Sequence, residues 1–191
     1  MRKIESIKIN NFDDLKFEIF NNYKTLSNVA PLNNGPVNIR IYNLLNTNTR
    51  LPELEKVKNY LLDNFNIVHF ELAIYGPYSG TGFHVDGAIR HILPIISDEM
   101  SYNFEMDINL PSIKEHYYTD KLYNGKPMGY TLEDIKPTLK DWFYNESDNN
   151  KLFIIPEGEC WEIEENPHAY VNCSFNHRIV IIFDTTKKIE N

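Results

Sequence analysis

The stretch that decides the fold is Asn166–Asp184, NPHAYVNCSFNHRIVIIFD, near the end of the chain. Two runs rich in β-branched and aromatic residues, at 168–172 and 178–184, flank a short polar segment, which is typical of two strands joined by a turn. Similar runs recur upstream: IVHFELAIY from Ile67, FHVDGAIRHILPII from Phe83, YNFEMDINL from Tyr102, KLFIIP from Lys151 and ECWEIE from Glu159. Short strands with frequent turns favour a sandwich, jelly roll or barrel over a parallel sheet.

The N-terminal third adds helices to this pattern. It predicts a strand over Ile4–Ile9, a helix over Leu15–Tyr23 after the polar cap residues Asn11 to Asp14, and a strand over Val37–Leu45. A second helix opens at Pro52, where apolar residues recur at spacings of three and four: Leu51, Leu54, Val57, Leu61 and Phe65. The predicted fold class is therefore mainly β with flanking helices.

Composition limits the possible functions. With 191 residues, 42% of them hydrophobic, the chain has the size of one ordinary domain and enough apolar side chain for a core. No long apolar run and no apolar leader are present, so we expect a cytoplasmic protein outside the membrane. The net charge of -8 disfavours nucleic acid as a partner. Cys160 and Cys173 are too few for a cysteine-rich zinc site, so any metal must use nitrogen and oxygen ligands.

The segment from Leu110 to Asn150 differs from its surroundings. It is polar, contains several aromatic residues, and has a helical pattern near Thr131 to Tyr144. We interpret residues 110–150 as an insertion between strands of a single domain spanning 1–191. Long insertions in compact domains are often functional, so the segment is either a lid that selects the substrate or a solvated excursion.

His84 and Asp86 form the first candidate site, in FHVDG. Alternation along a strand sends residues i and i+2 to the same face, so the imidazole and the carboxylate converge. This arrangement is half of a metal site. A His-x-Asp triplet alone is weak, because a surface histidine beside an aspartate is common by chance.

His168 and Arg178 form the second cluster. Their sequence positions differ by ten, an even number, around a polar turn, which places them opposite each other in one hairpin or across a sandwich. Asn172 either hydrogen-bonds near the site or caps this turn, and we favour the turn. Arg178 precedes the apolar run IVII, and a buried arginine needs an anion because unpaired buried charge is costly. That anion is an acidic side chain or the carboxylate of a ligand, which the guanidinium fork matches.

Together the clusters supply two imidazoles and one carboxylate, from His84, Asp86 and His168. This facial triad leaves open positions on iron(II) for a chelating cosubstrate and O2. 2-Oxoglutarate suits the site because its keto acid end can chelate the metal while its far carboxylate meets Arg178.

These residues resemble the iron(II)/2-oxoglutarate oxygenases, and within them the aspartyl/asparaginyl β-hydroxylase family. The resemblance covers about Phe70 to Asp184 without the insertion. It is carried by His84-Val-Asp86, Arg90-His91 before ILPI, Gly158-Glu-Cys-Trp161, His168, Asn172, Arg178 and the final IIFD. It implies a double-stranded β-helix, a cupin-like jelly roll, in which His84, Asp86 and His168 bind iron. It also implies that Arg178 binds the tail of 2-oxoglutarate and that His91 lies near this cosubstrate.

The chain departs from the family at Ile89, where the family often has an arginine; here Arg90 stands directly beside the histidine. The predicted function is an iron(II)- and 2-oxoglutarate-dependent dioxygenase that hydroxylates a C–H bond of an amino acid or peptide side chain of the Asp, Asn or Pro type. Two alternatives remain: a cupin-like metal enzyme that does not use 2-oxoglutarate, and a non-enzymatic β-sandwich with a structural metal. Arg178 discriminates, because only the first function needs its charge.

Overall fold

The computed structural model describes residues 1–23, 39–77, 79–84, 88–106, 129–131, 150–163, 168–172 and 174–190. Its helices are α1 (Phe12–Asn22) and α2 (Pro52–Asn64). Its strands are β1 (Arg2–Lys3), β2 (Ile39–Asn43), β3 (Ile67–Tyr75), β4 (Ser79–His84), β5 (Ile89–Ile96), β6 (Ser101–Met106), β7 (Gly129–Thr131), β8 (Asn150–Phe153), β9 (Trp161–Ile163), β10 (His168–Asn172) and β11 (Arg178–Thr185).

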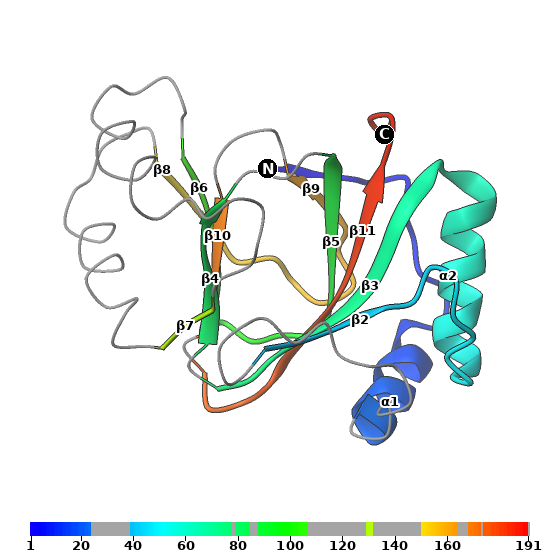
Figure 1. Cartoon of the computed structure of the whole chain (residues 1–191), viewed down its shortest axis with the longest axis horizontal. Helices are drawn as coiled ribbons and strands as arrows, with labels where there is room; N and C mark the ends of the chain where they lie inside the picture. Colours follow the sequence, from blue (N-terminus) through cyan, green and yellow to red (C-terminus); the bar gives the residue numbers. More distant parts are fainter. Residues whose placement is uncertain are drawn as a thin grey trace.

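The strands form two antiparallel sheets that face each other (Figure 1). The six-stranded sheet has the order β1-β9-β5-β11-β3-β2, and the five-stranded sheet has the order β7-β4-β10-β6-β8. From β3 to β6, and again from β8 to β11, successive strands alternate between the two sheets. This alternation is the topology of a double-stranded β-helix, or jelly roll. The predicted fold class, mainly β with flanking helices, is confirmed.

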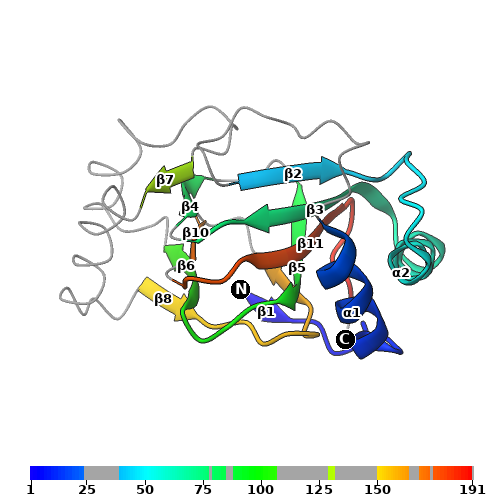
Figure 2. The same cartoon turned by 90° about the horizontal axis from the view of Figure 1, so that it is seen from below.

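Both helices cover the face of the six-stranded sheet that points away from the five-stranded sheet (Figure 2). Alternate residues of the sheet meet the helices in an outer core, to which β3 contributes Phe70 and Leu72 and β11 contributes Ile179, Ile181 and Phe183. The helices contribute Leu15 and Ile19 from α1 and Leu54, Val57 and Leu61 from α2. The apolar residues that recur at spacings of three and four in α2 therefore form the stripe that this helix buries.

The other face of the six-stranded sheet packs on the five-stranded sheet in an inner core. Its members are Ala73, Tyr75, Ile92, Ile163, Tyr170, Val180 and Ile182. Arg178 shares the alternation of Val180 and Ile182, so it also faces the space between the sheets.

α1 and α2 are joined by a carboxylate at a helix end. Glu18 accepts hydrogen bonds from the backbone N–H groups of Glu53 and Leu54 at 3.0–3.1 Å. These N–H groups lie in the first turn of α2 and have no partner within that helix. A negative charge there also interacts favourably with the helix dipole.

Two predictions for the N-terminal segment fail. The strand expected over Ile4–Ile9 is wrong, because β1 pairs with β9 only through Arg2 and Lys3, after which the chain leaves the sheet. Ile4 and Ile7 are buried in the outer core instead, at a spacing of three. Asn11 does precede α1, but its backbone is left-handed, with φ of 60°, and its side chain makes no capping hydrogen bond.

Most of the insertion 110–150 lies outside the described residues, and so does the helix expected near 131–144. The part that is described consists of β7 and the first residue of β8, which extend the two edges of the five-stranded sheet. Neither described helix is long and apolar enough to span a bilayer.

Candidate functional site

The five-stranded sheet brings two predicted metal ligands together. β10 lies between β4 and β6, and the register pairs His168 with His84 on one side and with Glu105 on the other. Directly opposed residues are the nearest cross-strand neighbours in an antiparallel sheet. Between the pairs Tyr170–Thr81 and His168–His84, β4 contains one extra residue, a bulge of the kind that is frequent beside active sites.

The side chains in this row are described in part. His168 is 5% exposed, and the buried carboxylate of Glu105 accepts a hydrogen bond from the Met1 amino group. The side chain of His84 and the whole of Asp86 lie outside the described residues. Among the side chains that are described, no group of three His, Cys, Asp or Glu residues could hold a metal. The structure thus joins His84 and His168 through the backbone register, and the ligand role of Asp86 remains a prediction.

Arg178 lies between the sheets, over Tyr170 of β10. Its side chain is 1% exposed, and its guanidinium carbon lies 4.0 Å from the centre of the Tyr170 ring. Nη1 and Nη2 donate to Oδ1 of Asn103 at 3.4 and 3.5 Å, while Nε has no hydrogen-bond partner in the part of the chain that the structure describes. Burial lowers the pKa of this guanidinium.

Register explains why these groups surround Arg178. Tyr75 is the β3 partner of Arg178, and Asn103 is the β6 partner of Tyr170. The rings of Tyr75 and Tyr170 meet edge-on, with centroids 4.3 Å apart. Within the described residues no carboxylate forms an ion pair with Arg178. Arg178 therefore has the interior position expected from the sequence, and the Asp98 carboxylate interacts with it electrostatically without forming an ion pair.

The β10–β11 connection crosses from one sheet to the other, so the sandwich and not the single hairpin is correct. Asn172, which is buried, holds this crossing: its Nδ2 donates to the backbone carbonyls of Gly76 and Asn176, both at 2.9 Å. Its Oδ1 accepts from the backbone N–H of Ser174 at 3.1 Å. The geometry is that of a turn cap, as favoured from the sequence.

His91 lies on the opposite face of the six-stranded sheet from Arg178. It is the cross-strand partner of Phe183, and the two rings are stacked 4.7 Å apart at 5°. Its Nε2 is 3.5 Å from Oε2 of Glu162, and burial lowers the pKa of the imidazole. Alternation along β11 sends Phe183 and Arg178 to opposite faces, so the structure does not bring His91 and Arg178 together.

Arg90 forms a bidentate ion pair with its cross-strand partner Asp184, with N–O distances of 2.9 and 3.1 Å. On the other side of Asp184 in the register is His69, whose Nε2 lies 2.6 Å from Oε2 of Glu71. The hydrogen bond with Glu71 raises the pKa of His69, although burial opposes this effect. The position of Arg90 beside the histidine is thus explained by an ion pair within the six-stranded sheet.

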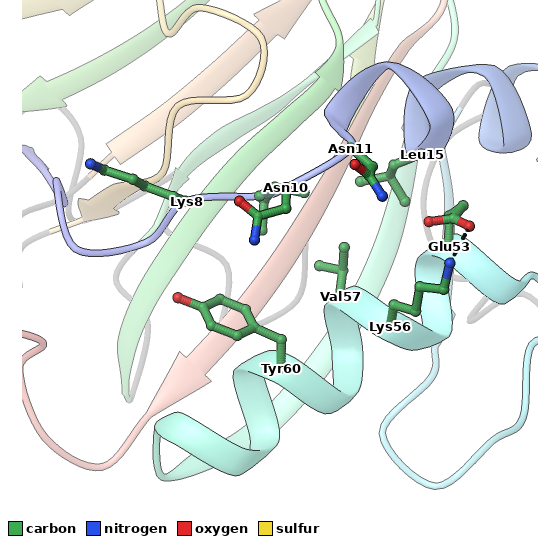
Figure 3. Close-up of a pocket in the computed structure, with 9 residues that line it drawn as sticks. Lys8, Asn10, Asn11, Leu15, Glu53, Lys56, Val57 and Tyr60 are labelled. Atoms are coloured by element: carbon green, nitrogen blue, oxygen red, sulfur yellow. Dashed lines mark hydrogen bonds and ion pairs between the residues drawn. The ribbon is translucent and has the colours of Figure 1, made fainter.

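A pocket of about 190 Å³ lies elsewhere, on the helix side (Figure 3). It is formed by the segment from Lys8 to Asn11, by Leu15 of α1, and by one side of α2 that includes Lys56 and Tyr60. Lys56 is tied to Glu53 within this wall. The pocket lies on the side of the outer core, so it is separate from the interior that contains His168 and Arg178.

Asn103 is the residue that sequence reasoning missed. A signal was present in SYNFEM, where polar Ser101, Asn103 and Glu105 alternate with apolar residues. All three polar side chains are buried. The strand therefore turns its polar side towards the interior, which is the reverse of an ordinary strand over an apolar core and indicates a polar site.

Comparisons with known proteins bear on the fold. No protein-family model and no curated protein matches the sequence. Among solved structures, HygX from Streptomyces hygroscopicus, with nickel and 2-oxoglutarate bound, has a TM-score of 0.53 at 9% identity, over 88% of this chain and 77% of that one. A cupin domain from Bordetella pertussis has a TM-score of 0.36 at 10% identity, over 63% and 83%. Hazelnut (Corylus avellana) vicilin has a TM-score of 0.44 at 14% identity, over 84% and 32%.

This chain thus spans about a third of the vicilin chain. At such low identity, the similarity to HygX extends to the fold alone.

Proposed function

We propose that this protein is an iron(II)- and 2-oxoglutarate-dependent dioxygenase that hydroxylates a C–H bond of an amino acid or peptide side chain. The observation that carries the proposal is the buried Arg178 guanidinium, which has no carboxylate partner among the described residues. It faces the strand that carries His168. An anion from outside the protein would compensate this charge.

The residues present fit both groups that the activity needs. His84 and His168 are cross-strand partners and offer the nitrogen ligands that suit iron(II), and Asp86 follows His84 by two residues. The orphaned Nε of Arg178 fits a carboxylate, since guanidinium groups bind carboxylates through paired N–H donors. A protein of similar fold, HygX, binds nickel and 2-oxoglutarate.

Each residue then has a distinct task. His84, Asp86 and His168 would hold the metal, and Arg178 would bind the remote carboxylate of 2-oxoglutarate. Tyr170 follows His168 by two residues and shares its side of β10, and the Arg178 guanidinium lies over the Tyr170 ring. A molecule that contacts both His168 and Arg178 would therefore pass along this ring. Iron(II) together with 2-oxoglutarate and O2 supplies the oxidising chemistry for hydroxylation.

The test compares the wild-type protein with His168→Ala and Arg178→Met, using His177→Ala as a control because His177 is exposed and adjacent to Arg178. Under anaerobic conditions, the visible absorbance of the iron–2-oxoglutarate chelate should appear in the wild-type protein and in the control. His168→Ala should lose iron, whereas Arg178→Met should keep iron and lose 2-oxoglutarate affinity by about tenfold or more.

Equal 2-oxoglutarate affinity in the wild-type protein and Arg178→Met would favour the cupin-like metal enzyme instead. Unchanged iron affinity in His168→Ala would remove the metal assignment. A screen for succinate release over free amino acids and peptides would then identify the substrate class.

A further inference from the structure

The two edges of the Arg178 guanidinium are not equivalent in this structure. A guanidinium has five N–H donors and can bind a carboxylate end-on, through Nη1 and Nη2, or side-on, through Nε and Nη2. Oδ1 of Asn103 accepts from both Nη atoms and so occupies the end-on edge. Nε, on the side-on edge, has no hydrogen-bond partner among the described residues. The edge left for a ligand is therefore the side-on edge.

Asn103 is held in the orientation that this contact requires. It is 1% exposed, and its Nδ2 donates to the backbone carbonyl of Phe153 on the neighbouring strand β8, at 3.5 Å. An amide that donates to Phe153 presents its oxygen to Arg178. An aspartate of the same shape would present a carboxylate and pair with the arginine within the protein.

We propose that Asn103 determines which anion Arg178 binds: it occupies the end-on edge with a neutral oxygen, directs a ligand carboxylate to Nε and Nη2, and brings no negative charge of its own to the guanidinium. This inference rests on the proposed function, because the ligand carboxylate is the tail of 2-oxoglutarate. Asn103 is a specificity-determining residue that acts through Arg178. Its neutrality is what allows a dicarboxylate to be preferred over a ligand with an uncharged tail.

The decisive variant is Asn103→Asp, which changes charge and hardly changes shape. The introduced carboxylate would lie beside the guanidinium and remain ionised, because a nearby opposite charge favours the charged form. Two dissociation constants are measured anaerobically with iron(II). One is for 2-oxoglutarate, and the other is for its analogue with a carboxamide in place of the remote carboxylate.

Asn103→Asp should bind 2-oxoglutarate about 100-fold more weakly than the wild-type protein does. The ratio of the two dissociation constants should shift towards the carboxamide analogue by about tenfold or more, while iron affinity stays within about twofold. Asn46→Asp, the same change in an exposed turn, is the matched control and should change none of these values.

Three outcomes overturn the inference. Affinity for 2-oxoglutarate in Asn103→Asp could stay within threefold of wild type, or both ligands could weaken equally, which would show a merely structural role. If Asn103→Asp does not fold, Asn103→Ala takes its place. It should lower the affinity for 2-oxoglutarate about tenfold without changing the affinity for iron, and an unchanged 2-oxoglutarate affinity would refute the role of Asn103. In each case Arg178→Met is measured in parallel. If Arg178→Met also binds 2-oxoglutarate normally, the proposed function itself fails.

Discussion

The buried guanidinium of Arg178 should destabilise the protein when no ligand is bound. In Arg178→Met, the free energy of unfolding without metal or 2-oxoglutarate is expected to rise by about 2 kcal/mol. Removing a guanidinium from water costs several kcal/mol. Stacking on Tyr170 stabilises the folded state by about 2 kcal/mol, and the long hydrogen bonds to Asn103 stabilise it by about 1 kcal/mol or less. In the variant, the buried methionine side chain stabilises the folded state by about 2 kcal/mol. The loss of a partner for Asn103 Oδ1 destabilises it by about 1 kcal/mol.

The assay is urea denaturation of the apoprotein, followed by tryptophan fluorescence. Arg90→Met is the matched control, because it makes the same change at an arginine that is paired with the largely buried Asp184. That variant should lose about 2 kcal/mol, because a charge is left without its partner. Adding iron and 2-oxoglutarate should stabilise the wild-type protein and not Arg178→Met. An apo Arg178→Met protein that is less stable than wild type by more than about 1 kcal/mol would refute the reasoning.

Three further predictions concern stability. Asn172→Ala should lose about 2–3 kcal/mol, because it removes a buried cap that joins two turns; a loss under about 1 kcal/mol in the same denaturation would contradict this role. Glu18→Ala should lower the free energy of unfolding by about 1 kcal/mol, and α2 should melt at a lower temperature, as followed by helical circular dichroism; an unchanged melting curve would count against the cap. The raised pKa of His69 means that its bond with Glu71 stabilises the fold fully below pH 6.5 and less as pH rises through the folded-state pKa. His69→Gln should therefore lose about 1 kcal/mol at pH 5.5 and less at pH 8.5, whereas an equal loss at both pH values would exclude protonation as the cause.

Local patterns predicted much of the fold. The strands of the last third and the helix from Pro52 follow from residue spacing, which the structure keeps. The interior position of Arg178 also follows, because one charged residue precedes a continuous apolar run. Ile4 and Ile7 led to a wrong prediction. Their β propensity favours a strand, but the two side chains are buried in the outer core from a segment that is not a strand.

Pairings between distant strands could not be predicted. The partner of Arg90, Asp184, depends on the register between β5 and β11, and that register contains a shift between Ile179 and Val180. The same register places His91 against Phe183. Asn103 contacts Arg178 only because two sheets face each other, and nothing within the sequence near either residue specifies that contact.

The alternation along β11 determines how substitutions can affect this protein. Ile179, Ile181 and Phe183 contact the helix layer, whereas Arg178, Val180 and Ile182 face the inner space. Volume-conserving changes at the first set should alter thermal tolerance and leave ligand preference intact. Changes at 180 or 182 would alter the room beside a bound molecule. Thermal tolerance and ligand choice are thus encoded by alternate residues of one strand, and an engineer could adjust them separately.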